Sequence, residues 1–260
     1  MITVLSPAKS LDYESPLATT KTSEPLMLDH SAELVGVMAG KSPKVIGKMM
    51  SISPQLAELN FERYQDWEVP FTTETARQAV LAFDGDVYQG LDAASLNQRD
   101  FTHAQKTLRI LSGLYGVLRP LDLMMPYRLE MGTKLKTKRG RDLYGFWGGR
   151  IAEQLNADIS ASPGEDVLVN LASVEYFKSV RTDVLEAPVV APVFMDAKGD
   201  GDFKVIAFFA KRARGAMAGW MIRNRVKSVD DLKGFDGMGY TFDAGRSTLE
   251  RPVFTRRNDG

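Results

Sequence analysis

The chain of 260 residues contains no cysteine and only two histidines. The absence of thiols excludes disulfides, thiolate metal sites and iron–sulfur ligation, and it suits a reducing compartment. His30 and His103 lie far apart in the sequence. A strong zinc or non-haem iron site is therefore not expected, which leaves only an all-carboxylate site open. We predict no metal site and no cofactor.

Long hydrophobic runs are absent as well. The apolar stretch Val205–Ala210 is among the longest, and it is far shorter than the roughly 20 residues that span a bilayer. The first residues, MITVLSPAKSLDYES, lack the basic and apolar regions of a secretory signal. No P-loop, dinucleotide-binding or nucleophile-elbow motif occurs. We expect a soluble, cytoplasmic protein that contacts no membrane.

The net charge is zero, with 33 basic and 33 acidic residues, but the two signs are separated along the sequence. Residues 104–150 contain ten cations and three acids, residues 204–227 contain seven cations and no acid, and residues 1–103 are net acidic. Clustered cations in a neutral protein are typical of a surface that binds a polyanion such as nucleic acid. The alternative is that basic and acidic faces pair with each other across the fold.

Apolar and β-branched segments predict the strands. They are Ile2–Leu5, Asp166–Leu171, Val189–Met195 and Phe203–Ala210, and the tail 239–257 predicts two antiparallel strands joined by a polar loop. No linker, repeat or low-complexity tract divides the chain. These patterns predict an α/β fold of the mixed α+β kind, in which a mixed sheet is surrounded by helices in a single compact domain over residues 1–260.

Helices are predicted between these strands. Ser42-Pro43 and Ser53-Pro54 each place a capping hydroxyl before a first-turn proline, so helices should begin there, the second with Leu56, Leu59 and Tyr64 facing inward. Another helix should run from Asp100 through Leu111 and end at Ser112-Gly113. The remaining predicted helices are 74–82, 142–156 and 211–226.

Polar and basic residues follow three of the predicted strands. They are Lys9 after the first, Glu175, Tyr176 and Lys178 after the second, and Lys211, Arg212 and Arg214 after the third. If the strands are parallel neighbours, their carboxyl ends share one edge, which is the usual place of ligand clefts in open α/β sheets. Five cations would then line one cleft. The alternative is that each strand end returns to solvent, where Lys and Arg are common.

A glycine-punctuated turn, Ser112–Leu118, follows the helix predicted to end at Gly113. Glycine lets backbone N–H groups approach a phosphate without a Cβ in the way, so Gly113 and Gly116 are candidate phosphate contacts. The turn resembles the hairpin of a helix-hairpin-helix DNA-binding motif, although two residues rather than one separate its glycines. The alternative is a glycine C-cap followed by a packing turn.

An enzyme is a second functional hypothesis. Lys9 or Lys178 would be the nucleophile, since crowding by other cations favours a neutral amine, or would clamp the anion, and Asp12 or Glu175 would move protons. Such a site would act on a nucleotide-like or other anionic substrate in a lyase-like or glycosylase-like reaction. The alternative is that Glu175 and Lys178 form an ion pair that fixes a loop.

Five blocks of the sequence, taken together and in order, resemble one known family. The blocks are Ser6–Tyr13 (SPAKSLDY), Ala82–Tyr88 (AFDGDVY), Leu111–Gly132 (LSGLYGVLRPLDLMMPYRLEMG), Asn170–Ser179 (NLASVEYFKS) and Ala210–Gly215 (AKRARG). They are similar to the YaaA family of bacterial peroxide stress proteins, and the resemblance spans essentially the whole chain.

The resemblance implies a cytoplasmic protein, induced by hydrogen peroxide, that limits oxidative damage by keeping free intracellular iron low. It also implies DNA binding through a positively charged cleft and a helix-hairpin-helix element, with the hairpin at Ser112–Leu118, and no settled enzymatic activity. We therefore predict a DNA-binding stress protein that contacts mainly the phosphate backbone; direct iron sequestration ranks last. The predicted contacts are Lys9, Gly113, Gly116, Arg119, Arg128, Lys134, Lys136, Lys138, Arg139, Lys178, Lys211, Arg212 and Arg214.

Overall fold

The central element of the computed structural model, which describes residues 1–258, is a five-stranded sheet with the order β6-β5-β1-β8-β9. Its strands are β1 (Ile2–Leu5), β5 (Leu108–Ser112), β6 (Gly116–Leu118), β8 (Leu168–Asn170) and β9 (Val189–Val190). β1 pairs in parallel with β5 and β8, β9 pairs in parallel with β8, and β6 runs antiparallel to β5. The predicted mixed sheet is confirmed.

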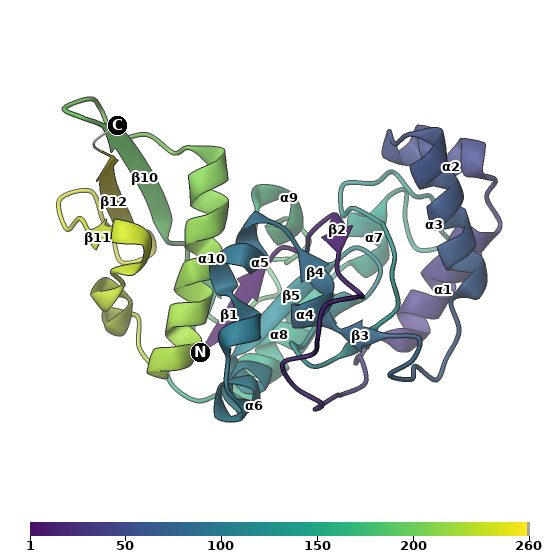
Figure 1. The fold of residues 1–260 in the computed structure, drawn as a ribbon, viewed down its shortest axis with the longest axis horizontal. Helices are drawn as coiled ribbons and strands as arrows, with labels where there is room; N and C mark the ends of the chain where they lie inside the picture. The colour runs from purple at the N-terminus through teal and green to yellow at the C-terminus, as the bar shows by residue number, and fades with distance from the viewer. Residues whose placement is uncertain (259–260) are drawn as a thin grey trace.

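Helices cover both faces of this sheet (Figure 1). On one face, Thr3 Oγ1 lies 3.7 Å from Met221 Sδ of α10 (Ala207–Asn224). On the other, Arg109 of β5 pairs with Asp158 of α8 (Arg150–Ala161). Thr3 is in register with Leu108, so the next residue, Arg109, points to the opposite face. β1 is buried at every position, as expected for a parallel strand covered on both sides.

Short helices and two-residue strands complete the region around the sheet. The helices are α4 (Ala79–Ala82), α5 (Asp86–Leu91), α6 (Gln98–Thr107), α7 (Leu143–Trp147) and α9 (Val174–Phe177). The strands pair as β2 (Ser10–Leu11) with β4 (Phe83–Asp84) and β3 (Arg77–Gln78) with β7 (Leu123–Met124). Together they bury Phe101, Tyr115 and Trp147 completely.

A second sheet lies beyond α10, at the left of Figure 1. It has the order β10-β12-β11, formed by β10 (Val193–Lys198), β12 (Val253–Asn258) and β11 (Thr241–Phe242). β11 and β12 are antiparallel, which confirms the prediction for the tail. In its core Phe194 and Phe254 stack, and Phe235 meets both rings edge to face. Trp220 of α10 in turn meets Phe235 edge to face at 5.8 Å, so Trp220 packs within the protein.

α5 and α10 approach each other at backbone contact distance. A Cβ at Gly215 would lie 1.7 Å from the carbonyl oxygen of Val87, and a Cβ at Gly219 would lie 2.6 Å from that of Leu91. No other side chain fits at Gly215 unless the backbone moves. This contact fixes α10 against α5.

Three helices form the opposite end of the molecule (Figure 1, right): α1 (Leu28–Ala39), α2 (Pro43–Met50) and α3 (Pro54–Asp66). The helix starts predicted at Ser42-Pro43 and Ser53-Pro54 are confirmed. Tyr64 is buried as predicted, but Leu56 and Leu59 are 39% and 40% exposed. Their burial was predicted wrongly because α3 turns the face of Ala57 and Tyr64, seven residues apart, toward the core.

Two predicted elements have the wrong type. The helix predicted through Leu111 ends at Thr107, because Leu108–Ser112 forms strand β5 beside β1. The strand predicted at Phe203–Ala210 is absent, since α10 begins at Ala207. Short apolar runs do not distinguish a strand from a buried helix, and in both cases tertiary packing decided the outcome.

Two predicted helices have different bounds. In the segment 74–82 only Ala79–Ala82 is helical. The segment 142–156 is divided into α7 and α8 by Gly148, whose φ of 53° is left-handed. The strand predicted at 166–171 is shorter in the structure, where β8 covers only Leu168–Asn170. The strand predicted at 189–195 is divided into two, β9 and β10.

Candidate functional site

The loops after β1 and β8 meet at the carboxyl edge of the five-stranded sheet. Ser173 N–H donates to Ser6 Oγ at 2.8 Å, and Ser6 Oγ donates to Ser173 Oγ at 3.2 Å. The buried hydroxyl of Tyr88 donates to the carbonyl of Ser6 at 3.0 Å. β1 and β8 are therefore parallel neighbours whose ends share one edge, which meets the condition set in the sequence analysis for two of its three strands.

The first turns of α10 point toward this same edge. The carbonyl of Lys227, just beyond α10, accepts from Glu165 N–H ahead of β8, so the last turn of the helix lies at the amino edge and the first turn lies at the carboxyl edge (Figure 1). Lys211 and Arg212 are exposed there, and burial lowers the pKa of the half-buried Arg214. None of these three side chains has a hydrogen-bond or ion-pair partner among residues 1–258.

Lys9, by contrast, is part of a charged triad. Its Nζ lies 2.8 Å from Glu130, and Arg128 Nη2 donates to the same carboxylate at 3.1 Å. The side chain of Lys9 is nevertheless 65% exposed. Its ammonium group thus contacts an acidic side chain of the same protein, and this geometry supports an ion pair rather than a nucleophile.

Glu175 and Lys178 do not form the ion pair considered from the sequence. The carboxylate of Glu175 instead accepts a hydrogen bond from Gly132 N–H at 2.9 Å. The backbone carbonyl of Glu175 accepts another from Tyr144 OH at 3.0 Å. The Lys178 ammonium lies 4.8 Å from the centre of the Tyr144 ring. Glu175 thus holds both ends of the loop 132–144, while Lys178 stands beside the base of that loop.

Asp12 caps the turn that follows it. Its carboxylate accepts from the backbone N–H groups of Glu14 and Ser15 at 2.9 Å each. Hydrogen bonds from Ser15 lower the pKa of Asp12 to about 2. A carboxylate with so low a pKa is a weak general base, so this geometry gives Asp12 a structural role.

The predicted helix-hairpin-helix at Ser112–Leu118 is wrong, because the turn joins the two strands β5 and β6. Gly113 and Gly116 are both buried in this β-hairpin. The carbonyl of Gly113 accepts from Trp147 Nε1 at 3.0 Å, and a Cβ on Gly113 would lie 2.1 Å from the carbonyl oxygen of Leu129. The glycines allow close packing in the core, and at this depth neither meets a phosphate.

The basic loop 132–144 presents a row of cations to solvent. Thr133 and Leu135 are buried, whereas Lys134, Lys136 and Lys138, which we call the lysine ladder, are exposed. Arg141 is exposed as well, and neither it nor the ladder has a side-chain partner in the part of the chain that the structure describes. The tip of the loop is held against α1 by Arg139, which pairs with Glu33 and contacts His30 at 3.2 Å.

Other cations of the 104–150 segment hold the fold together. Arg109 makes a buried bidentate pair with Asp158. Arg119 donates to Asp122 and to the carbonyl of Glu24. The sequence does not distinguish cations that form ion pairs from cations that do not. The structure shows that Arg109 and Arg119 have acidic partners, whereas the lysines of the ladder have none among the described residues.

A helical hairpin that the sequence analysis did not single out lies at α2 and α3. The three residues Ser51–Ser53 join the two helices, with Ser51 in the left-handed region at φ 54° and Ser53 Oγ accepting from Leu56 N–H. Lys44 and Lys48 are exposed on α2. The repeated Ser-Pro pairs were the available signal, since they marked two helix starts eleven residues apart.

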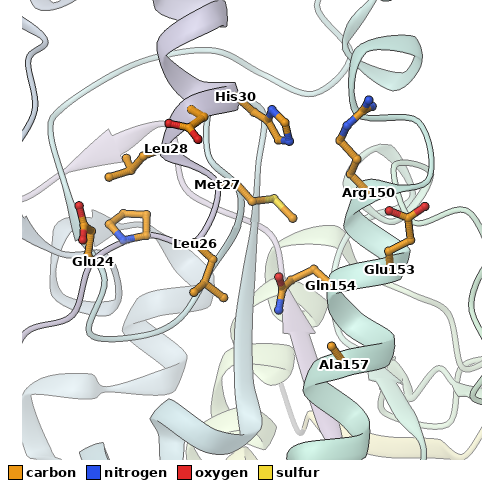
Figure 2. A pocket seen from close by; sticks show the side chains of 11 residues that line it. Glu24, Leu26, Met27, Leu28, His30, Arg150, Glu153, Gln154 and Ala157 are labelled. Atoms are coloured by element: carbon orange, nitrogen blue, oxygen red, sulfur yellow. The ribbon is translucent and has the colours of Figure 1, made fainter.

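A pocket of about 480 Å³ lies between the segment 24–30 and one side of α8 (Figure 2). His30 and Arg150 face each other at one end of it. Burial and the nearby charges of Arg139 and Arg150 lower the pKa of His30.

Within residues 1–258, no group of three or more His, Cys, Asp or Glu side chains is arranged to hold a metal ion. Over the same residues, no helix is long and apolar enough to cross a membrane.

Fold and surface together define an α/β protein in which cations on a structured loop and on a helix beside a sheet edge have no side-chain partner within residues 1–258. The model of the peroxide stress protein YaaA family matches residues 1–246. A UPF0246 protein of Paraburkholderia phytofirmans (strain DSM 17436 / LMG 22146 / PsJN) is 54% identical over 258 residues, which cover 99% of each chain. The chain therefore belongs to the YaaA family of peroxide stress proteins, and this membership supports a role in peroxide stress.

Proposed function

We propose that the protein binds DNA by its phosphate backbone, through the lysine ladder together with Arg141, Lys178 and three cations in the first half of α10, Lys211, Arg212 and Arg214. The observation that carries this proposal is the contrast within one segment. Arg109, Arg119 and Arg139 each have an acidic partner, while the three ladder lysines have none among the described residues. The ladder presents a row of ammonium groups on a loop whose base and tip are fixed by hydrogen bonds and an ion pair. Such a row is complementary in charge to the successive phosphates of a DNA strand.

The helical hairpin supports the same function. α3 begins at an exposed turn, and Lys44 and Lys48 stand on the preceding helix. Helix N-termini and neighbouring lysines are common contacts of the DNA backbone. In this proposal α2 and α3 take the place that the sequence analysis gave to Ser112–Leu118, and Gly113 and Gly116 have no part in it.

The decisive experiment measures the salt dependence of duplex binding by fluorescence anisotropy. Wild type should lose affinity steeply as salt rises, and the triple variant Lys134→Gln, Lys136→Gln, Lys138→Gln should lower the slope of log K against log salt by about 3. The matched control replaces Lys106, Lys198 and Lys204 by Gln, which are exposed lysines outside the ladder. Equal effects of the two triple variants would contradict the ladder, and a flat salt response of wild type would contradict DNA binding itself.

Family membership also leads us to propose that the protein lowers free intracellular iron during peroxide stress. The test compares chelatable iron, measured by electron paramagnetic resonance, in peroxide-treated cells that lack the gene and in cells complemented with wild type or with the ladder variant. Equal iron levels with and without the gene would refute this role. Rescue by the ladder variant would separate iron control from DNA binding.

A further inference from the structure

The pocket beside α8 carries charges of both signs and includes no residue of the lysine ladder (Figure 2). Its volume of about 480 Å³ lies within the range of small-molecule sites. α8 lines it with Arg150, Glu153, Gln154 and Ala157, whose spacing places all four on one side of the helix. The other wall is the segment 24–30.

One end of the pocket is rich in hydrogen-bond donors. Arg139 can only donate, so its contact with His30 Nδ1 places the imidazole proton on Nε2. Arg150 uses Nη1 for the carbonyls of Phe146 and Trp147, and its Nε and Nη2 have no partner among the described residues. His30 and Arg150 project from opposite walls at this end, so their free N–H groups suit a carboxylate.

A carboxylate and an apolar surface lie next to this donor end. Glu153 is exposed one turn along α8 from Arg150, and its side chain has no partner within residues 1–258. Leu26, 46% exposed, and Ala157 provide apolar contact farther along the groove. The pocket therefore offers an anion subsite, a cation subsite and an apolar subsite in close succession.

We propose that this pocket binds a free α-amino acid with an apolar side chain. The ligand carboxylate lies between Arg150 and His30, its ammonium group faces Glu153, and its side chain packs along Leu26 and Ala157. An α-amino acid carries both charges on one carbon, which matches the donor Arg150 and the acceptor Glu153 one turn apart on α8, with His30 facing them from the other wall.

Isothermal titration calorimetry of the full chain tests the proposal with L-leucine, L-methionine and L-phenylalanine at up to about 10 mM. At least one should bind, and for L-leucine the analogues 4-methylpentanoate, without the amine, and leucinamide, without the carboxylate, should bind about tenfold more weakly or worse. Glu153→Gln should weaken L-leucine about tenfold and leave 4-methylpentanoate unchanged.

Two further variants test whether the ligand occupies the groove, by comparing a phenylalanine placed inside the pocket with one placed outside it on the same helix. Ala157→Phe should fill the apolar subsite and abolish binding, whereas Ser160→Phe, exposed on the same helix outside the pocket lining, should not. Binding of leucinamide as tight as that of L-leucine would make this a cation site, and equal binding of 4-methylpentanoate would make it an anion site. Either result, or no binding of any of the three amino acids, overturns the proposal.

Discussion

The carboxylate of Glu175 accepts a hydrogen bond from the backbone N–H of Gly132 at 2.9 Å, across 43 residues of sequence. This bond closes the base of the loop that carries the lysine ladder. The carboxylate of Glu175 thus supports a basic surface through the position of its hydrogen bond, although its negative charge would weaken the proposed binding of DNA.

Position and charge can be separated at Glu175 with two variants. Glu175→Gln and Glu175→Ala remove the same charge, but only glutamine retains an acceptor for Gly132. We expect Glu175→Ala to bind duplex DNA about fivefold more weakly than Glu175→Gln, since one hydrogen bond contributes on the order of 1 kcal/mol. Titrations at one fixed salt concentration measure this, and identical affinities would show that the loop does not depend on the bond.

The buried pair of Arg109 and Asp158 supports stability. Arg109 Nε and Nη2 donate to the two carboxylate oxygens at 2.7 and 2.9 Å. Asp158→Asn should lower the free energy of unfolding by about 3–5 kcal/mol, because it leaves a buried guanidinium without its counter-charge. Urea titration measures the loss. The double variant Arg109→Met, Asp158→Leu should recover most of it, and simple additivity of the two changes would refute the pairing argument.

Gly113 is required for packing in the core. Gly113→Ala places a Cβ 2.1 Å from the carbonyl oxygen of Leu129, so it should destabilise the fold by on the order of 3 kcal/mol or more. Gly36→Ala in α1, where a Cβ meets nothing within 4 Å, should instead stabilise by about 0.5–1 kcal/mol. Thermal unfolding compares the two variants. A folded Gly113→Ala with normal stability and weakened DNA binding would restore the phosphate role predicted from the sequence.

His30 makes stability depend on pH. Its pKa is lowered from 6.5, so between that lowered value and 6.5 the unfolded chain binds more protons than the folded chain. The free energy of unfolding should therefore fall as the pH is lowered through this window. Urea midpoints between about pH 7 and 5 should show a shallower decline for His30→Gln than for wild type. The pKa of His103 is lowered as well, but His103 is present in both proteins, so its contribution cancels when their pH profiles are compared. Parallel pH profiles would contradict the prediction.

Where local signals are strong, the sequence predicted the fold well. The helix starts at Pro43 and Pro54 followed from proline and capping serine, and the strands β1 and β8 followed from apolar and β-branched runs. Leu108–Ser112 was predicted as helix because its apolar residues continue the helical spacing of α6. It forms strand β5 instead, because it pairs with β1. Pairing partners are distant in sequence, and periodicity does not reveal them.

The candidate site was predictable only in part. Alternation of lysine with small or apolar residues at 133–138 does correspond to alternating exposure. The role of Glu175 depends on a contact with Gly132, and the burial of Gly113 depends on Leu129, so neither is visible in local sequence. A glycine needed for close packing and one needed for phosphate contact have the same appearance in a sequence.

The glycines of α10 fix the rotation of this helix about its own axis. Gly215 and Gly219 must face α5, so the angular positions of Lys211, Arg212 and Arg214 are determined by the same constraint. Inserting a single residue between Arg214 and Gly215 would rotate these cations by about 100° relative to the glycines. Relatives of this chain should therefore tolerate exchange of individual α10 cations more readily than any change in the length of this helix.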